Sequence, residues 1–270
     1  MLQHLRKMSL IILVGVLVMA VILAGCSGEE TAYDKVMDRG KLIVGTSADY
    51  PPFEFVNDAG EFDGFDMEII KEIADRMDLD IEIRDMGFDT LIATVQQGRV
   101  DCLIASMSAT PERREQVDYT DIYYSSGHGF LMKVGSDVQL SAPEEMADYK
   151  VGVQTGTSHE KWLMDNLVDE GEMSDDDVLR YEKADQGIMD VIAERIDIFI
   201  ADGPVARDYA KEMPEVEVRF EYDLNPVYGG TRIMVAKGEH ELRDALNDVL
   251  AELKEEGFIE ALEEKWIYSD

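Results

Sequence analysis

The chain has 270 residues, of which 46% are hydrophobic, and its 58 acidic residues outnumber its 25 lysines and arginines to give a formal net charge of −33. This much apolar sequence is enough for one large domain or two smaller ones and excludes a disordered acidic tail. The negative charge excludes nucleic acids and anionic lipid head groups as partners, because both repel an acidic protein.

The amino terminus is typical of an export signal. Arg6 and Lys7 precede an apolar run over residues 10–23, which is shorter than the roughly 20 residues that a bilayer span needs. The tetrapeptide L-A-G-C at residues 23–26 resembles the lipobox of prokaryotic lipoproteins, in which cleavage leaves a lipidated cysteine. This resemblance implies a signal peptide over residues 1–25, a lipid on Cys26, a tether over residues 26–39 and an extracytoplasmic location at the cell membrane. An uncleaved anchor is the alternative.

The next stretch predicts strands that alternate with amphipathic helices. We expect strands over residues 41–46, 81–84 and 100–105. A helix is expected from Asp66, because apolar residues recur four apart at Phe65, Ile69 and Ile73. A second helix is expected from Asp89, which is placed to cap it.

The second half repeats this pattern. Strands are expected over residues 150–154, 178–181 and 196–201, with helices over 157–167 and 186–194 between them. A helix over residues 204–212, a strand, a second strand over 232–236, a long helix over 239–256 and a final helix near Trp266 complete the prediction.

Two short segments of the first half are similar to segments of the second. Residues 99–106 (RVDCLIAS) align with 195–202 (RIDIFIAD), and residues 42–46 align with 151–155, in the same order. This order favours two lobes of similar design. Ligands of open parallel sheets bind beyond the carboxyl ends of the strands, so Ser106 and Asp202 are expected to face a shared cleft.

Cysteine and histidine usage predicts no metal and no cofactor. Cys102 lies in an apolar run and is expected in the core, and one remaining thiol cannot form an internal disulfide or a zinc cage. The four histidines are His4, His128, His159 and His240, and they have no catalytic or metal-ligand spacing. His159 is expected on a helix surface, although it could border the cleft.

The chain from Lys41 to Trp266 resembles the polar amino-acid-binding proteins of bacterial and archaeal ABC importers, the family-3 solute-binding proteins. The similarity lies in residues 44–55, G-F-D at 64–66, T-P-E-R-R at 110–114, residues 117–124, V-G-V-Q-T-G-T at 151–157, and residues 252–257 with 265–266. The resemblance implies the type II periplasmic-binding-protein fold: an α/β fold of two lobes, each a mostly parallel sheet flanked by helices, joined by a two-strand hinge. Lobe 1 would comprise residues 40–124 and 225–270, and lobe 2 residues 125–224. The crossovers would fall near residues 123–126 and 224–228.

The resemblance also implies a function. The protein would be a monomer that captures an amino acid between closing lobes and delivers it to the permease subunits of an ABC transporter, without catalysis. Two alternatives are a ligand-sensing module of a signalling system and a dehydratase-like enzyme on the same fold.

Arg113 and Asp202 are the residues that the resemblance assigns to the ends of the amino acid. The guanidinium of Arg113 would bind the α-carboxylate through two parallel hydrogen bonds, and Asp202 would bind the ammonium. Without the resemblance, Arg113 would be a surface residue paired with Glu112 or Glu115. Asp202 would cap the helix that follows it.

Eight further residues are implied to contact the ligand. Ser106 and Ser108 would offer a backbone carbonyl and a hydroxyl, Thr157 and Ser158 would offer N–H and O–H donors, and Tyr50 and Phe88 would sandwich the ligand side chain unless they are ordinary core. Phe53 is expected to be packing only. Ser47 and Gln154 are expected to face the ligand side chain, and these two residue types favour a neutral or polar amino acid over a cationic one.

Overall fold

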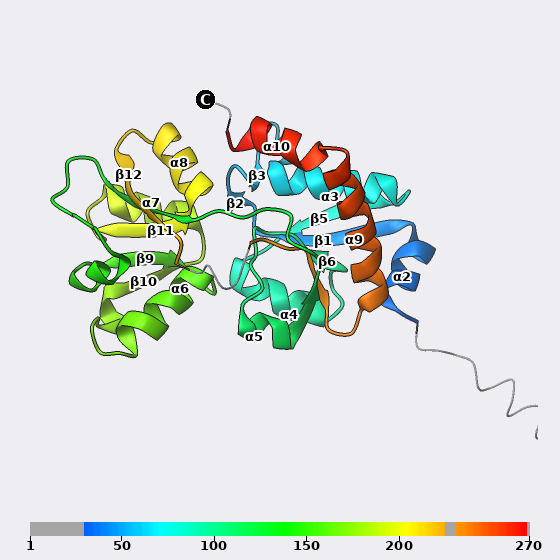
Figure 1. Cartoon of the computed structure of the whole chain (residues 1–270), viewed down its shortest axis with the longest axis horizontal. Helices are drawn as coiled ribbons and strands as arrows, with labels where there is room; N and C mark the ends of the chain where they lie inside the picture. The colour runs from blue at the N-terminus through cyan, green and yellow to red at the C-terminus, as the bar shows by residue number, and fades with distance from the viewer. Residues whose placement is uncertain (1–29, 225–229, 269–270) are drawn as a thin grey trace, which may run out of the picture.

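The computed structural model describes residues 30–224 and 230–268. Two five-stranded sheets lie side by side, each with helices on both faces (Figure 1). The predicted signal peptide, Cys26 and residues 225–228 of the second predicted crossover lie outside the described residues.

The first sheet combines strands from both ends of the chain in the order β5-β1-β6-β13-β7. The strands are β1 (Lys41–Thr46), β5 (Asp80–Asp85), β6 (Cys102–Leu103), β7 (Val117–Tyr119) and β13 (Met234–Ala236). Strand β13 is antiparallel to both of its neighbours, whereas β1 is parallel to β5 and β6, so four of the five strands run in one direction. The predicted mostly parallel sheet is confirmed.

The second sheet has the order β10-β9-β11-β8-β12 and the same design. Its strands are β8 (His128–Lys133), β9 (Val151–Gln154), β10 (Val178–Tyr181), β11 (Ile198–Asp202) and β12 (Val216–Tyr222). Strand β8 is the antiparallel one. In the first sheet, β1, which contains residues 42–46 of one repeated segment, lies beside β6 from the repeated segment 99–106. In the second sheet, β9 and β11, from the matching segments 151–155 and 195–202, lie side by side in the same way. This placement agrees with the internal similarity found in the sequence.

Helices cover both sheets. They are α3 (Phe65–Arg76), α4 (Leu91–Gln96), α5 (Pro111–Gln116), α6 (Ser158–Leu163), α7 (Ala184–Ile192), α8 (Gly203–Glu212), α9 (His240–Glu255) and α10 (Phe258–Trp266). Helix α9 buries a leucine stripe, Leu242, Leu246, Leu250 and Leu253, so it packs on the core through one face. Helices α9 and α10, from the carboxyl-terminal end of the chain, lie over the first sheet beside α3 from its amino-terminal half (Figure 1).

The predicted tether over residues 26–39 is wrong for its second half. Residues Ala32–Arg39 form helix α2, which packs against α9. Thr31 and Asp34 form a capping box at its start, Gly40 ends it in a left-handed conformation with φ 63°, and Val36 is fully buried. A segment with both caps and a buried apolar residue folds with the domain.

Local differences from the prediction occur where the backbone leaves a regular element. Strand β6 covers only Cys102–Leu103 because the chain turns away from the sheet after it. The helix expected over residues 157–167 is α6 followed by a π-helical turn, η3 (Met164–Val168). The helix expected from Asp89 begins as a 3-10 turn, η1 (Phe88–Thr90), without a side-chain cap. A small antiparallel sheet of β2 (Asp49–Tyr50), β3 (Glu54–Val56) and β4 (Phe62–Asp63) was not predicted.

Two connections join the sheets. One links β7 to β8 and the other links β12 to β13, and they run together where the N–H of Tyr123 donates to the Thr231 carbonyl (3.0 Å) and that of Thr231 donates to the Tyr124 carbonyl (2.8 Å). The first connection crosses as a long green segment in Figure 1.

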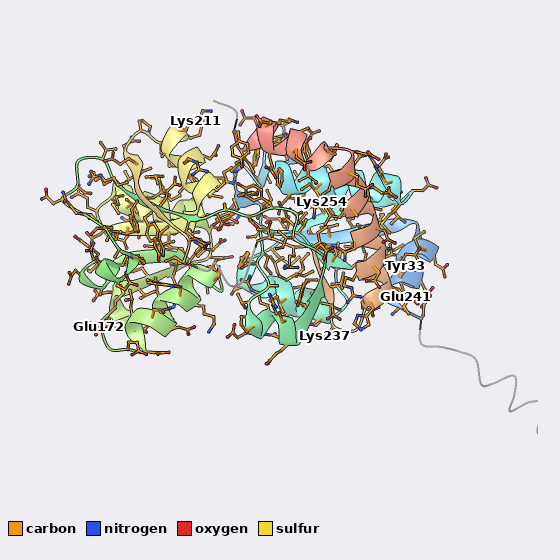
Figure 2. All side chains as sticks on the ribbon, viewed as in Figure 1. Tyr33, Glu172, Lys211, Lys237, Glu241 and Lys254 are labelled. Carbon is orange, nitrogen blue, oxygen red and sulfur yellow. The ribbon has the colours of Figure 1, made fainter. Side chains whose placement is uncertain are left out.

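Charged side chains cover the outside of both halves. Figure 2 shows Glu172, Lys211 and Glu241 on the outer surface, where all three are exposed. Within residues 30–224 and 230–268, no helix combines the length and the apolar composition that a bilayer crossing requires.

Candidate ligand-binding site

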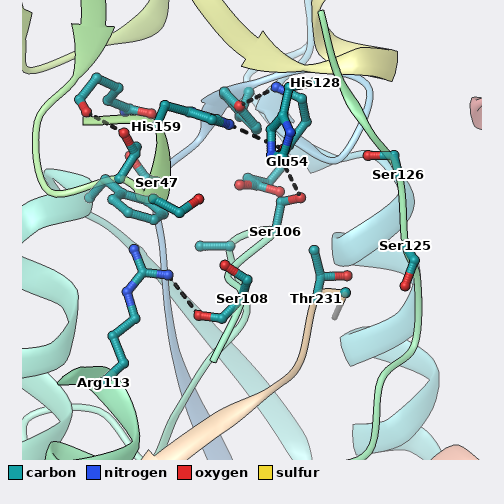
Figure 3. A pocket seen from close by; sticks show the side chains of 18 of the residues that line it. Ser47, Glu54, Ser106, Ser108, Arg113, Ser125, Ser126, His128, His159 and Thr231 are labelled. Carbon is teal, nitrogen blue, oxygen red and sulfur yellow. Dashed lines mark hydrogen bonds and ion pairs between the residues drawn. The ribbon is translucent and has the colours of Figure 1, made fainter. Parts of the chain in front are cut away.

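A cavity of about 220 Å³ lies where the carboxyl ends of β1, β6, β9 and β11 meet. All ten residues predicted to contact a ligand line it: Ser47, Tyr50, Phe88, Ser106, Ser108, Arg113, Gln154, Thr157, Ser158 and Asp202. In Figure 3, Arg113 enters from one side and His128 and His159 from the other. The volume is below the roughly 300–1,000 Å³ typical of sites for drug-sized molecules, so the cavity suits a small metabolite.

The turn after β6 shapes one wall of the cavity. Ser106 has a left-handed backbone (φ 45°), which is uncommon for a residue with a side chain. Its N–H donates to a carboxylate oxygen of the buried Asp66 at 2.7 Å, and Asp66 also accepts from the hydroxyl of Tyr123 at 2.7 Å. Asp66 thereby holds the strained turn, which directs the Ser106 hydroxyl at the cavity.

Arg113 is a buried cation on the short helix α5. Thr110 caps this helix and Pro111 begins it, and only 7% of Arg113 is exposed. Its Nη1 donates to the Ser108 carbonyl (2.8 Å) and its Nη2 to the Gly156 carbonyl (3.0 Å). Burial lowers the pKa of Arg113 to about 10, so the group stays charged at neutral pH. Across the described parts of the chain, Arg113 forms no ion pair with a carboxylate. The alternative of a surface arginine is wrong.

Asp202 lies at the end of β11, on the other side of the cavity. It is the residue before helix α8, but its side chain makes no capping hydrogen bond, which excludes the helix-cap interpretation for the carboxylate. Its Oδ2 accepts from the Ser106 hydroxyl (3.3 Å), and its backbone N–H donates to the Tyr50 hydroxyl (2.9 Å). Although burial acts to raise it, His159, His128 and Ser106 hold the pKa of Asp202 below its usual value.

The two predicted aromatic residues reach the cavity with different neighbours. The guanidinium of Arg113 lies over the ring of Phe88, with Cζ of Arg113 5.3 Å from the ring centroid. Tyr50 is buried beside Asp202 through its hydroxyl. Phe53 is fully buried against Phe65 and Tyr124, and the prediction that it is only packing is confirmed.

Thr157 and Ser158, which follow strand β9, differ in whether their hydrogen-bond donors are already used within the protein. Thr157 donates both its N–H (3.4 Å) and its hydroxyl (2.7 Å) to the Gln154 carbonyl, so it can offer neither to a ligand without breaking this turn. Ser158 begins α6 and keeps its position at the cavity wall.

Ser47 and Gln154 are both bound to Asp49. The Ser47 hydroxyl donates to Oδ1 of Asp49 at 2.8 Å, and the Gln154 amide donates to Oδ2 at 3.2 Å. The backbone N–H of Ala184 also donates to Oδ2, at 2.8 Å. The carboxylate of Asp49 is therefore used by protein donors, and Asp49 does not line the cavity.

Sequence reasoning missed a buried acid in the cavity wall. Glu54 is 1% exposed, and its Oε2 has no hydrogen-bond partner. Burial, and then the neighbouring Asp66, raise the pKa of Glu54 well above its usual value, while burial raises that of Asp66 to about 6. Burial thus favours the protonated form of both carboxyls. Polar residues of the two connections, Ser125, Ser126 and Thr231, were also missed.

Two histidines are the largest departure from the prediction. His159, expected on a helix surface, is 4% exposed and faces the cavity from the first turn of α6. His128 begins β8, opposite Asp202 in the antiparallel register of β8 and β11. Burial, and then His159, lower the pKa of His128 to about 4, so it is neutral at pH 7. The antiparallel register of β8 and β11 brings residues 128 and 202 together. Because these residues are far apart in the sequence, no local pattern predicts that they are neighbours.

Cys102 is fully buried in the core, as predicted. Burial raises the pKa of its thiol well above the usual value, so the thiolate that could act as a nucleophile does not form.

Comparison with known proteins relates this site to a family. Residues 42–269 match the profile described as bacterial extracellular solute-binding proteins, family 3. The L-cystine-binding protein TcyJ of Escherichia coli K12 is 28% identical over 270 residues, covering 100% of this chain and 98% of TcyJ. The arginine-binding extracellular protein ArtP of Bacillus subtilis 168 is 32% identical over 226 residues, covering 84% of this chain and 86% of ArtP.

Solved structures agree with this relationship. An ancestral arginine-binding protein bound to arginine superposes with a TM-score of 0.77 at 33% identity, covering 84% of this chain and 98% of that one. The ancestral amino acid-binding protein AncCDT-1, a precursor of cyclohexadienyl dehydratase, superposes with a TM-score of 0.77 at 31% identity, covering 87% and 98%. The relatives and neighbours described here are named as binding proteins.

Proposed function

The chain belongs to the bacterial extracellular solute-binding proteins of family 3, and we propose that it captures a free amino acid between its two lobes for delivery to an ABC transporter. One observation carries this proposal. A buried cation, Arg113, and a half-buried anion, Asp202, line the same cavity and form no ion pair with each other. An amino acid supplies one group of each sign: its carboxylate would bind Arg113 and its ammonium Asp202.

The two lobes would close on the ligand by moving about the hinge, and contacts between the lobes would stabilise the closed arrangement. We place lobe 1 in residues 40–124 and 225–270 and lobe 2 in residues 125–224. Contacts between the two sides include the Arg113 donation to the Gly156 carbonyl and an ion pair of 3.0 Å between Lys161 and Glu112. A ligand that contacts both sides favours the closed arrangement by its differential affinity, and shifting a 1:99 population to 99:1 requires roughly 5.5 kcal/mol.

We propose a neutral or polar amino acid as the ligand. The acidic group behind the two selectivity residues, Asp49, is already bound by Ser47, Gln154 and Ala184, which leaves it poorly placed to bind a cationic side chain. Glu54 lines the cavity, but its raised pKa favours the neutral acid. Both features reduce the negative charge that lysine or arginine would need.

Membership of the family places the protein outside the cytoplasm. We propose further that Cys26 carries a lipid that tethers the protein to the membrane, and that the protein acts as a monomer with permease subunits as its partners. These proposals rest on the lipobox-like tetrapeptide and on the family, since residues 1–29 are not described.

An enzymatic function is the second candidate, because AncCDT-1 is a precursor of a dehydratase and because Glu54 is a buried acid with a raised pKa in the cavity wall. We propose that the protein is not an enzyme. Incubation with prephenate or arogenate should give no product, and turnover that disappears in Glu54→Gln would establish the enzymatic alternative.

Isothermal titration calorimetry of the full-length protein in detergent, with each of the twenty amino acids, tests the proposed function. We expect one or a few neutral or polar amino acids to bind most tightly. Arg113→Ala should weaken that binding by about 100-fold or more, because two charge-assisted hydrogen bonds contribute roughly 1.5–3 kcal/mol each. Strongest binding of arginine would contradict the proposed selectivity.

Arg114→Ala is the matched control. Arg114 is adjacent in the chain, donates to the Ala109 carbonyl at 2.7 Å and does not line the cavity, so its loss should leave the affinity unchanged. The melting temperature of empty Arg113→Ala should stay close to that of the wild type, since removing a buried unpaired charge offsets the loss of two hydrogen bonds. Wild-type affinity in Arg113→Ala would overturn the proposed carboxylate site.

A further inference from the structure

Three side chains that commonly bind metal ions meet in the wall of the cavity. One ligand atom from each of His128, His159 and Asp202 lies within 4.8 Å of the other two. Oδ1 of Asp202 is 3.5 Å from Nε2 of His159 and 3.8 Å from Nε2 of His128. Ligands of a tetrahedral zinc ion lie about 2.0–2.2 Å from the metal and hence about 3.3–3.6 Å from each other. Small side-chain rotations would bring these atoms to that geometry.

His159 provides an independent sign that this wall holds a ligand. Its Nε2 is buried and makes no hydrogen bond, and the residue is 4% exposed. Oδ1 of Asp202, 3.5 Å away, is an ion-pair partner of this nitrogen only when the imidazole is protonated. Buried polar atoms without a partner are rare because desolvating them is costly. The proposed contacts of an amino acid with Arg113 and Asp202 do not use this nitrogen, so the amino-acid function leaves it unexplained.

His128 has the second contact that a metal-binding histidine needs. Its Nδ1 is 3.3 Å from the Tyr222 carbonyl oxygen, an acceptor of the kind that fixes the ring of a metal-bound histidine. The N–H of Leu224 also approaches Nδ1, at 3.0 Å. Metal binding at Nε2 places the proton on Nδ1, so the ring would then donate to Tyr222 and lose the hydrogen bond from Leu224.

We propose that His128, His159 and Asp202 form a site for a divalent transition-metal ion of the zinc class. Two imidazoles and one carboxylate favour zinc and its neighbours over magnesium or calcium, which prefer oxygen ligands. Three protein ligands leave a position open toward the cavity, where a water or a donor atom of a small molecule completes the coordination. This site goes beyond the proposed function, because it requires neither Arg113 nor an amino acid.

The experiment titrates zinc alone into full-length protein that has been stripped with a chelator. We expect one site that His159→Gln weakens at least tenfold and that the double variant His128→Gln with His159→Gln abolishes. His159→Gln loses no hydrogen bond at Nε2, so it should fold even if the double variant does not. His240→Gln is the matched control, since His240 is exposed and pairs with Asp118 outside the cavity. Its zinc affinity should equal that of the wild type.

Cobalt provides a second readout, because its visible absorption reports the number and the type of its ligands. We expect the spectrum of cobalt with nitrogen ligands and a low coordination number, which changes in His159→Gln and is lost in the double variant. Arg113→Ala should keep the zinc site while losing the amino acid, and amino-acid titrations in chelator test the proposed function separately. Equal zinc binding by the wild type and His159→Gln would be adventitious binding to the acidic surface, and it would overturn the site. So would the absence of saturable binding by the wild type.

Discussion

A buried guanidinium without a carboxylate partner is costly unless another molecule supplies the anion, and Arg113 is in this position. Two carbonyl oxygens and the face of Phe88 compensate part of the cost but carry no full negative charge. The carboxylate of Asp202 has the Ser106 hydroxyl and the imidazoles of His128 and His159 around it. Arg113 and Asp202 thus line one cavity without pairing with each other.

Glu54 permits a test of how burial acts on one residue. A carboxyl whose folded pKa is raised destabilises the protein increasingly as the pH rises from the unfolded value, near 4.5, through the folded one. Glu54→Gln mimics the protonated form and lacks this loss. The difference in melting temperature between Glu54→Gln and the wild type should thus increase in favour of the variant from pH 4.5 to pH 8. A difference that does not change with pH would show that Glu54 is not buried as an acid.

Single residues were predictable where a matching motif or a strand end marked them. Arg113 follows the Thr-Pro pair that begins a helix, and Asp202 ends an apolar strand, so the sequence predicted both at the cavity. His128 and His159 could not, because a strand register and a helix start bring them together across 31 positions. Glu54 was hidden for a similar reason, since its burial depends on a small sheet that was not predicted.

At the scale of elements, strand β9 of the second sheet packs closely against the side chains of Ile196 and Phe199. Gly152 in β9 has no room for a side chain: an added Cβ would lie 2.4 Å from Cδ1 of Ile196 and 3.0 Å from Cδ2 of Phe199. The repeated segment that contains Ile196 and Phe199 can pack against β9 only because this position is glycine.

Gly152→Ala should therefore destabilise the protein by about 1–3 kcal/mol, the usual cost of overpacking a core. Urea unfolding measures the change through its midpoint. Gly127→Ala is the control, because its nearest neighbour would be 3.7 Å from the added Cβ, an ordinary contact. Equal midpoints for Gly152→Ala and the wild type would show that this strand packing is looser than described.

Some elements with a clear apolar period were predicted almost to the residue, whereas α7, β11 and β13 each begin two residues from the expected position. Strands β1 and β10 have the expected bounds, α8 begins one residue earlier than expected, and α9 is one residue shorter at each end. The errors lie where a few specific contacts decide the backbone: Asp66 turns the chain out of β6 at Ser106, and a capping box makes α2 from a stretch expected to be a tether. Such contacts involve residues distant in sequence or short polar motifs, which periodicity does not detect.

The whole molecule carries a net charge of −33, which repels itself in the compact state. Salt screens this repulsion over distances of about 10 Å at 0.1 M and less at higher concentration. Raising sodium chloride from 0.05 to 0.5 M at pH 7 should stabilise the folded protein and increase its melting temperature by at least about 3 °C. In a chain of this size, a change of 1 kcal/mol in the free energy of unfolding corresponds to roughly 2–4 °C.

The same salt step near pH 4.3, the isoelectric point, provides the control. There the net charge is close to zero, so the increase should largely disappear. An equal salt effect at both pH values would assign it to a general action of salt on burial, and not to self-repulsion.

The central claim is that one amino acid joins Arg113 to Asp202, and the most direct measurement compares three ligands on two variants by calorimetry. The ligands are the tightest-binding amino acid, its carboxamide, which lacks the negative charge, and its deaminated acid, which lacks the positive one. We predict that Arg113→Ala weakens the amino acid and the deaminated acid but not the carboxamide, and that Asp202→Asn weakens the amino acid and the carboxamide but not the deaminated acid. If each variant weakened all three ligands equally, the two charges would not be bound where this account places them.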